Sequence, residues 1–128
     1  MTTTMRLFRL NVEVRDLNEA AGFYGALLGV EARLQAGSRC YVAAGDVTLQ
    51  VVQVAEPQLL PKALYFVVDD LAAVHARARD LGCLSQEMVH GTPAGEPTVR
   101  PWGENSFYAD DPTGNPLCFV ETGTIYAG

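Results

Sequence analysis

The sequence is poor in the residues from which metal centres and disulfide frameworks are built. It has two histidines and three cysteines, and no two cysteines form a CxxC pair. An odd and scattered set of cysteines indicates neither a zinc knuckle nor a disulfide scaffold, and it fits a reducing compartment. No stretch approaches the roughly 18 uninterrupted apolar residues of a membrane span. We therefore expect Cys40, Cys83 and Cys118 to be small core residues.

Basic residues are also scarce, with nine Lys and Arg against fifteen Asp and Glu, for a net charge of −6. The negative electrostatic field of such a protein disfavours nucleic acid and anionic lipid as partners. The opening letters MTTTMRLFRLNVEV run directly into a strand-like pattern and lack the layout of a signal peptide. The apolar fraction of 48% argues against disorder. The sequence predicts a cytoplasmic protein with one domain over residues 1–128 and no membrane partner.

The first half of the chain alternates in a way that predicts a strand, then a helix, then three strands. Residues 7–15 alternate between apolar and polar, as in a half-exposed strand. Asp16 and Asn18 are both suitable helix N-caps, and Gly29 suits the helix C-terminus. Strand-like runs follow around residues 31–34, 39–44 and 47–54. Pro57 and Pro61 then mark a connector, because proline interrupts both helix and ladder.

The second half repeats this order. A strand-like run over 63–68 precedes Asp70, which caps a helix expected over 71–81. Strands are expected near residues 85–90, 98–102, 105–110 and 116–121, with hairpin chemistry in DPTGN at 111–115. The letters VEVRDLNEAAGFYGALLG and FVVDDLAAVHARARDLG match when Asp16 is aligned with Asp70. The repeat predicts an α+β fold of two βαβββ modules, over residues 6–55 and 62–122, packed together.

Two segments resemble a known superfamily: VEVRDLNEAAGFYGALLG and PWGENSFYADDPTGNPLCFVE. They are similar to the vicinal oxygen chelate superfamily, which includes glyoxalases, bleomycin resistance proteins and extradiol dioxygenases. The second segment is closest to the C-terminal signature of bleomycin resistance proteins. The resemblance implies curved mixed sheets that form a cup, with the helices outside. It also implies a homodimer, with cups formed within or between chains.

Metal-dependent members of this superfamily place His, Glu or Gln ligands at four strand positions. The resemblance carries these positions onto Arg9, Gln50, Ala63 and Cys118. Arginine is a fixed cation and alanine offers no donor atom. A single glutamine and a single thiol are a poor set for a divalent ion. We therefore expect no metal and no cofactor. An unconventional site built from Glu13, His90 and Cys118 stays open.

Strand alternation predicts which side chains face the cup. The predicted ligand-binding residues are Arg9, Glu13, Gln50, Tyr65, Trp102, Tyr108 and Cys118. Trp102 either stacks on a planar ligand or closes the end of the core. Arg9 either pairs with Glu13 or receives an anionic group of a ligand. Phe107 and Phe119 point the other way and are expected in the core, and His75 is expected to be a solvated helix residue.

The sequence is compatible with two functions of different classes. The first is a metal-independent protein that binds or sequesters a small molecule, with antibiotic binding as the precedent that the resemblance supplies. The second is a glyoxalase-like metalloenzyme, a lyase or isomerase of the lactoylglutathione lyase type, or a dioxygenase-like enzyme. The residues at the four ligand positions favour the first. Whether the chain is an enzyme, and the charge of its ligand, stay open, because Arg9 suggests an anion and the net charge suggests a cation.

Overall fold

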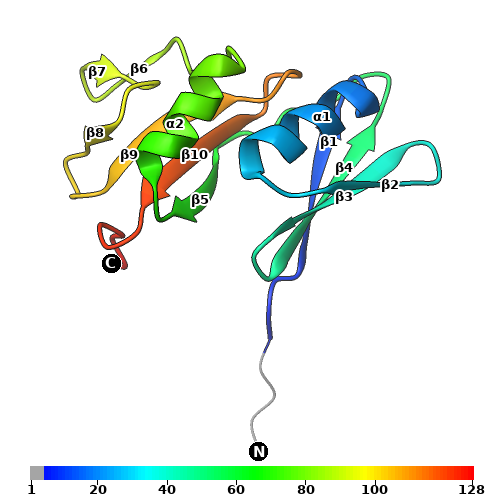
Figure 1. Cartoon of the computed structure of the whole chain (residues 1–128), viewed down its shortest axis with the longest axis horizontal. Helices are drawn as coiled ribbons and strands as arrows, with labels where there is room; N and C mark the ends of the chain where they lie inside the picture. Colours follow the sequence, from blue (N-terminus) through cyan, green and yellow to red (C-terminus); the bar gives the residue numbers. More distant parts are fainter. Residues whose placement is uncertain (1–4) are drawn as a thin grey trace, which may run out of the picture.

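Each half of the chain forms one helix and one four-stranded sheet (Figure 1). The structure is a computed structural model that describes residues 5–128. Residues 1–4, which open the segment expected to contain no signal peptide, lie outside the described part. The first module consists of β1 (Arg9–Val14), α1 (Leu17–Leu28), β2 (Ala32–Gln35), β3 (Arg39–Ala44) and β4 (Val47–Gln53). The second module consists of β5 (Leu64–Val68), α2 (Leu71–Asp80), β6 (Met88–Val89), β7 (Thr92–Pro93), β8 (Thr98–Val99), β9 (Asn105–Asp110) and β10 (Pro116–Glu121).

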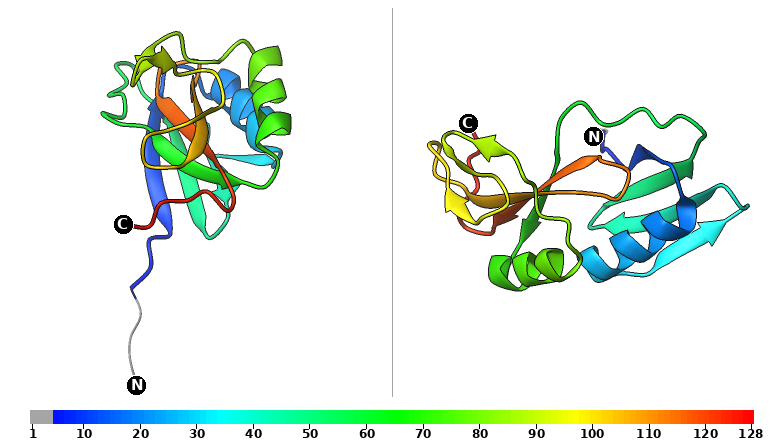
Figure 2. Two further views of the ribbon diagram at one scale, coloured as in Figure 1. Left: turned by 90° about the vertical axis from the view of Figure 1, so that its left-hand side faces the viewer. Right: turned by 90° about the horizontal axis from the view of Figure 1, so that it is seen from above.

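The two sheets have the same topology. Their strand orders are β1-β4-β3-β2 and β5-β10-β9-β8. The first strand of each module is parallel to its last strand, and the other pairs are antiparallel. The sheets are mixed and do not close into a barrel, and the helices lie next to each other along one side of the molecule (Figure 2). The predicted α+β fold, built from a repeated unit, is confirmed.

The strands expected near 85–90 and 98–102 are shorter than predicted. The first is reduced to β6, which pairs only with β7 in a separate two-stranded sheet. The second is reduced to the two residues of β8. Pro97 and Pro101 flank β8, and proline has no N–H to donate to a ladder. Residues 90–104 therefore form a long, mostly irregular segment beside the second sheet.

Both helices begin at an aspartate. The Asp16 carboxylate accepts a hydrogen bond of 2.9 Å from the Glu19 N–H, so Asp16 rather than Asn18 is the N-cap of α1. Asp70 accepts one of 3.0 Å from the Ala73 N–H at the start of α2. Gly29 ends α1 with φ 69°, a left-handed conformation that glycine adopts without a Cβ penalty. No helix of residues 5–128 is long and apolar enough to cross a membrane.

The core lies between the helices and the sheet faces turned toward them. Val12, Val51, Phe107 and Phe119 are among its fully buried members. The rings of Phe107 and Phe119 stack with centroids 5.2 Å apart, which confirms the prediction that these two residues belong to the core. The opposite faces of the two sheets carry the polar and aromatic side chains that alternate with this core.

The two modules are joined through the β9–β10 turn, the DPTGN segment, which reaches the first module (Figure 1). The hydroxyl of Tyr24, on α1, donates a 2.7 Å hydrogen bond to Asp111. Asn115 donates to the carbonyl of Glu13 on β1 and accepts from the N–H of Leu60 in the connector, each at 2.9 Å. The segment that carries part of the family resemblance is therefore a joint between modules.

Candidate functional site

The outward face of the first sheet is polar. Register places Asn11 of β1, Gln50 of β4 and Tyr41 of β3 in one row across it. The Gln50 amide donates a 2.6 Å hydrogen bond to the Asn11 side-chain oxygen. Gln50 is therefore on the predicted face, with its amide nitrogen already engaged. This row is the centre of the first half of the candidate site.

Arg9 and Glu13 also lie on this face, but they do not pair. The Arg9 guanidinium carbon lies 5.1 Å from the ring centroid of Phe8 and 5.7 Å from that of Tyr41. Glu13 accepts a 2.9 Å hydrogen bond from the Gln58 N–H. Of the two alternatives for Arg9, the pair with Glu13 does not form, because four residues along a strand separate their Cα atoms by about 13 Å. Arg9 is exposed and free to meet a ligand.

In the second module, Tyr65, Cys118 and Tyr108 form one row on the outward face. The two tyrosine hydroxyls lie 3.4 Å apart, so the tyrosines close over the cysteine between them. Cys118 has no exposed surface, and burial raises the pKa of its thiol to about 11. Burial, followed by the hydrogen bond to Tyr65, also raises the pKa of Tyr108. Of this row, Tyr65 is the residue that a ligand can reach most freely.

Arg100 lies beside this row and was not among the predicted site residues. It is 2% exposed, and its Nε donates to the Ser106 hydroxyl at 3.0 Å. One Nη donates to the Ser106 carbonyl at 2.8 Å and the other to Thr92 at 3.2 Å, while the guanidinium lies 5.4 Å from the Tyr108 ring centroid. Arg100 therefore connects the segment around Thr92 to Ser106 on β9. Nothing in its sequence context distinguishes it from a surface arginine.

The donor set does not fit the divalent ion that the superfamily implies. Arg9 is a cation, Ala63 has no donor, and Cys118 is a protonated thiol near the Arg100 cation, whose charge acts on its pKa. Gln50 alone offers an oxygen, and an amide oxygen is a weak ligand without carboxylates beside it. Within residues 5–128, no group of three or more His, Cys, Asp or Glu side chains comes together to hold an ion.

The two histidines occupy different surroundings. His75 was expected to be solvated, and this is wrong, because its side chain is only 14% exposed. Its Nε2 lies 3.0 Å from the Gly95 carbonyl, and its ring packs edge-on against Phe107. His90 is an exposed loop residue whose ring packs edge-on against Trp102, with centroids 5.1 Å apart. His75 therefore anchors the irregular segment 90–104, and His90 supports the tryptophan.

Trp102 borders a cavity of about 480 Å³ on the outward side of the second sheet. Its indole N–H donates a 2.7 Å hydrogen bond to Glu104, and the other Glu104 oxygen accepts one of 2.9 Å from the Tyr126 N–H. Glu104 thus fixes the tryptophan to the C-terminal segment. The cavity is lined by Tyr65, Phe66, Val67, Trp102, Glu104, Val120, Ile125 and Tyr126. Of these residues, Tyr65 and Trp102 belong to the predicted ligand-binding set, and Val67 and Val120 to the predicted cup face.

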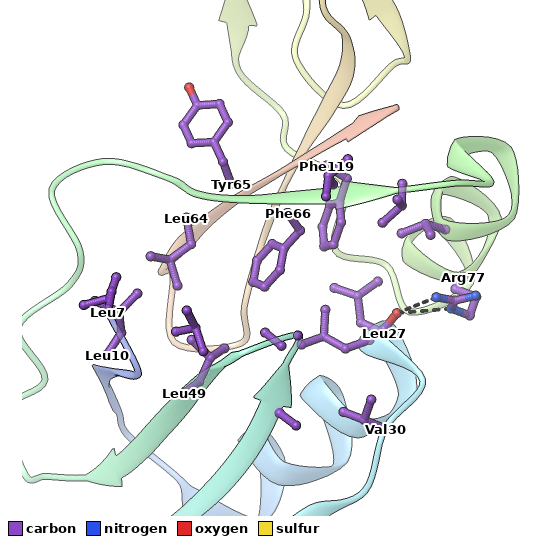
Figure 3. A pocket seen from close by; sticks show the side chains of 18 residues that line it. Leu7, Leu10, Leu27, Val30, Leu49, Leu64, Tyr65, Phe66, Arg77 and Phe119 are labelled. Carbon is purple, nitrogen blue, oxygen red and sulfur yellow. Dashed lines mark hydrogen bonds between the residues drawn. The ribbon is translucent and has the colours of Figure 1, made fainter. Parts of the chain in front are cut away.

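A second cavity, of about 510 Å³, lies between the modules on the side of the helices (Figure 3). Leu27, Leu49 and Phe66 point into it, whereas Tyr65 points to the opposite side of β5. Its one charged lining residue, Arg77, already donates to the Leu27 carbonyl at 2.8 and 3.1 Å. Few polar groups are left there to orient a ligand, so the cavity beside Trp102 is the better candidate.

Comparison with known proteins agrees with this architecture. Residues 9–120 match the family model described as a glyoxalase-like domain. Among solved structures, the chain is similar to the oxidase ChaP-H1, with 26% identity and a TM-score of 0.78 over 98% of this chain and 100% of that one. No curated protein matches the sequence.

Two further solved structures share the fold. The bleomycin resistance determinant encoded on transposon Tn5 is 20% identical, with a TM-score of 0.71 over 93% of this chain and 99% of that one. Lactoylglutathione lyase from Agrobacterium tumefaciens is 19% identical, with a TM-score of 0.70 over 99% and 100% of the two chains. The repeated module, its strand order and the family match agree, and the chain belongs to the glyoxalase-like domain family of the vicinal oxygen chelate superfamily.

Proposed function

We propose that this protein is a metal-independent binding protein that sequesters a small, partly aromatic molecule in the cytoplasm, with an antibiotic as one such molecule. The observation that carries the proposal is the cavity of about 480 Å³ beside Trp102. Its size suits a drug-sized ligand, and its lining joins apolar area to few polar groups. The three cysteines are free thiols, in keeping with a reducing compartment.

Trp102 supplies the recognition surface for such a ligand. The tryptophan is half-buried, and its indole N–H donates to Glu104. The ring is therefore already fixed before a ligand binds, and binding has to order it no further. Tyr65 and Tyr126 add two further aromatic side chains to the same cavity. A planar molecule that stacks among these rings gains contact area without any covalent step. The binding role therefore needs no nucleophile and no metal.

The test is a titration of bleomycin followed by tryptophan emission, since Trp102 is the one tryptophan in the chain. Binding should change the emission of the wild type. Calorimetry should show that Trp102→Leu weakens binding at least about tenfold, which is about 1.4 kcal/mol. The control is Leu34→Ala, which removes an exposed apolar side chain on β2, away from the cavity. Equal affinity of Trp102→Leu and the wild type, for bleomycin and for a panel of planar antibiotics, would refute the proposal.

We also propose that the protein is a homodimer. Tyr65 and Val67 are 59% and 55% exposed on the outward face of β5, and Leu7 and Phe8 are similarly exposed just before β1. Apolar side chains gathered on open faces are typical of surfaces that a second subunit covers. Sedimentation equilibrium should give about twice the chain mass of 13.8 kDa. A monomer at micromolar concentration would remove the dimer from the proposal.

The similarity to an oxidase, at 26% identity over nearly the whole chain, supports an enzyme as the competing function, and the enzymes considered from the sequence depend on a metal ion. Metal analysis separates the two. Protein expressed with added nickel, zinc, manganese and iron, and then desalted, should contain far less than one metal per chain. Stoichiometric metal would overturn the metal-independent role and would direct the work to oxidase and lyase assays.

A further inference from the structure

Strand register places three arginines on the outward face of the first sheet, in three different rows around Tyr41. Arg33 on β2 is the cross-strand partner of Tyr41 on β3. Arg39 lies two residues from Tyr41 on the same strand, so both point to the same face. Arg9 on β1 reaches over from the far edge of the sheet, with its guanidinium carbon 5.7 Å from the Tyr41 ring centroid. We call Arg9, Arg33 and Arg39, with Tyr41 at their centre, the arginine face.

None of these arginines has a carboxylate partner among residues 5–128. The ion pairs in the described part of the chain involve Arg15, His75 and Arg79, and not the arginine face. This is unexpected in a chain with fifteen acidic and nine basic residues. Glu13 lies in the register row of Arg39, with Val52 between them, and one of its carboxylate oxygens accepts from the Gln58 N–H. Three like charges on one sheet face repel one another, and an external anion would relieve that repulsion.

The neighbouring side chains add hydrogen-bond donors. The Gln50 amide donates one hydrogen bond to the side-chain oxygen of Asn11. Among the hydrogen bonds of residues 5–128, the two amide protons of Asn11 have no acceptor. Arginine forks match the geometry of carboxylate and phosphate oxygens. From this combination we propose that the arginine face binds a small molecule through an oxyanion group, a phosphate or a carboxylate. This site does not depend on the proposed function of the Trp102 cavity.

The net charge of −6 does not oppose this assignment. Charges more than about 8 Å away are largely screened at physiological salt, so the local cluster decides what binds. A second copy of the chain is a poorer occupant, because a twofold interface sets the same surface of both copies face to face and would oppose three arginines to three arginines. Nucleic acid is a poorer occupant too, since only three cations would meet a long polyanion.

The experiment is calorimetric titration of the full chain with pyrophosphate and, in parallel, with citrate. These two probes separate phosphate from carboxylate as the preferred oxyanion. The wild type should bind at least one of them with a dissociation constant below about 1 mM. Arg33→Gln and Arg39→Gln should each weaken binding about tenfold, whereas Arg39→Lys, which keeps the charge and loses the fork, should weaken it less.

Arg79→Gln is the matched control, since it removes the same charge from the exposed side of α2. It should change the dissociation constant less than twofold. Trp102→Leu should also leave anion binding intact, so failure of the Trp102 proposal and failure of this one are distinguishable. The assignment is overturned by an absence of binding at about 10 mM of either probe, or by equal losses in Arg79→Gln and Arg39→Gln. A changed oligomeric state in the arginine variants would overturn it too, in favour of a second copy on this face.

Discussion

Tyr24→Phe should loosen the joint between the modules and lower the stability of the whole chain. The change removes one hydroxyl from a buried site. Asp111 is 3% exposed and accepts five hydrogen bonds: three at Oδ1 from the backbone of residues 113–115, and two at Oδ2 from Tyr24 and the Asn115 amide. Without the hydroxyl, a buried carboxylate oxygen keeps one partner instead of two.

The expected cost follows from the charge of the acceptor. A hydrogen bond to a charged group contributes roughly 1.5–3 kcal/mol, so about 2 kcal/mol should be lost from the free energy of unfolding. For a domain of this size, that loss lowers the melting temperature by about 8 °C. Because no surface is newly exposed in the folded state, the dependence of unfolding free energy on urea concentration should not change.

Urea unfolding followed by circular dichroism measures both quantities. The control is Tyr126→Phe, which removes a hydroxyl from a tyrosine that is 60% exposed and should change stability by less than about 0.5 kcal/mol. If Tyr24→Phe and the wild type unfold at the same urea concentration, the Tyr24–Asp111 contact does not hold the modules together. A reduced slope would instead show that the modules unfold separately.

Three other outcomes are expected. Burial first, then the nearby carboxylates, raises the pKa of Asp110 in the folded state, so stability falls as pH rises through the interval between its unfolded and folded values. Asp110→Asn should therefore raise the melting temperature at pH 7, and this gain should vanish near about pH 3, while a gain that persists there would have another cause. Burial raises the pKa of all three cysteine thiols, so a thiol reagent should react slowly with native protein at neutral pH and quickly in urea; three fast thiols in native protein would contradict their placement. Gly95→Ala should destabilise the protein by at least about 1 kcal/mol, since its Cβ would lie 2.6 Å from the Ser85 carbonyl oxygen, and an unchanged melting temperature would show that this backbone can yield.

The elements of the fold could be predicted because they depend on local patterns. Asp16 and Gly29 mark the ends of α1, and alternation assigned Phe107 and Phe119 to the core. The irregular segment 90–104 was harder to predict, because its conformation depends on distant partners. His75 looks like a solvated residue on a helical wheel, and only the packed structure shows it against Phe107.

The site could be predicted only in part. Alternation placed Arg9, Gln50 and Tyr65 on outward faces, because the side of the sheet to which a side chain points follows from its position in its own strand. Arg33 and Arg39 carry the same local signal, but their position beside Tyr41 depends on the register between strands, which the alternation within one strand does not give. Glu104 follows Trp102 by two residues, a spacing with no general meaning. Its contact with the C-terminal segment arises from a turn.

The position of the joint between modules has a consequence for how such a protein can change over time. Asp111 and Asn115 join the halves through groups that neither line the Trp102 cavity nor belong to the arginine face. Substitutions on the outward faces can therefore accumulate without weakening the attachment of one half to the other, because distant sites act nearly additively on stability. New ligand preferences can be explored at little risk to folding. A chain of this design can keep its turn sequence while its binding surfaces diverge.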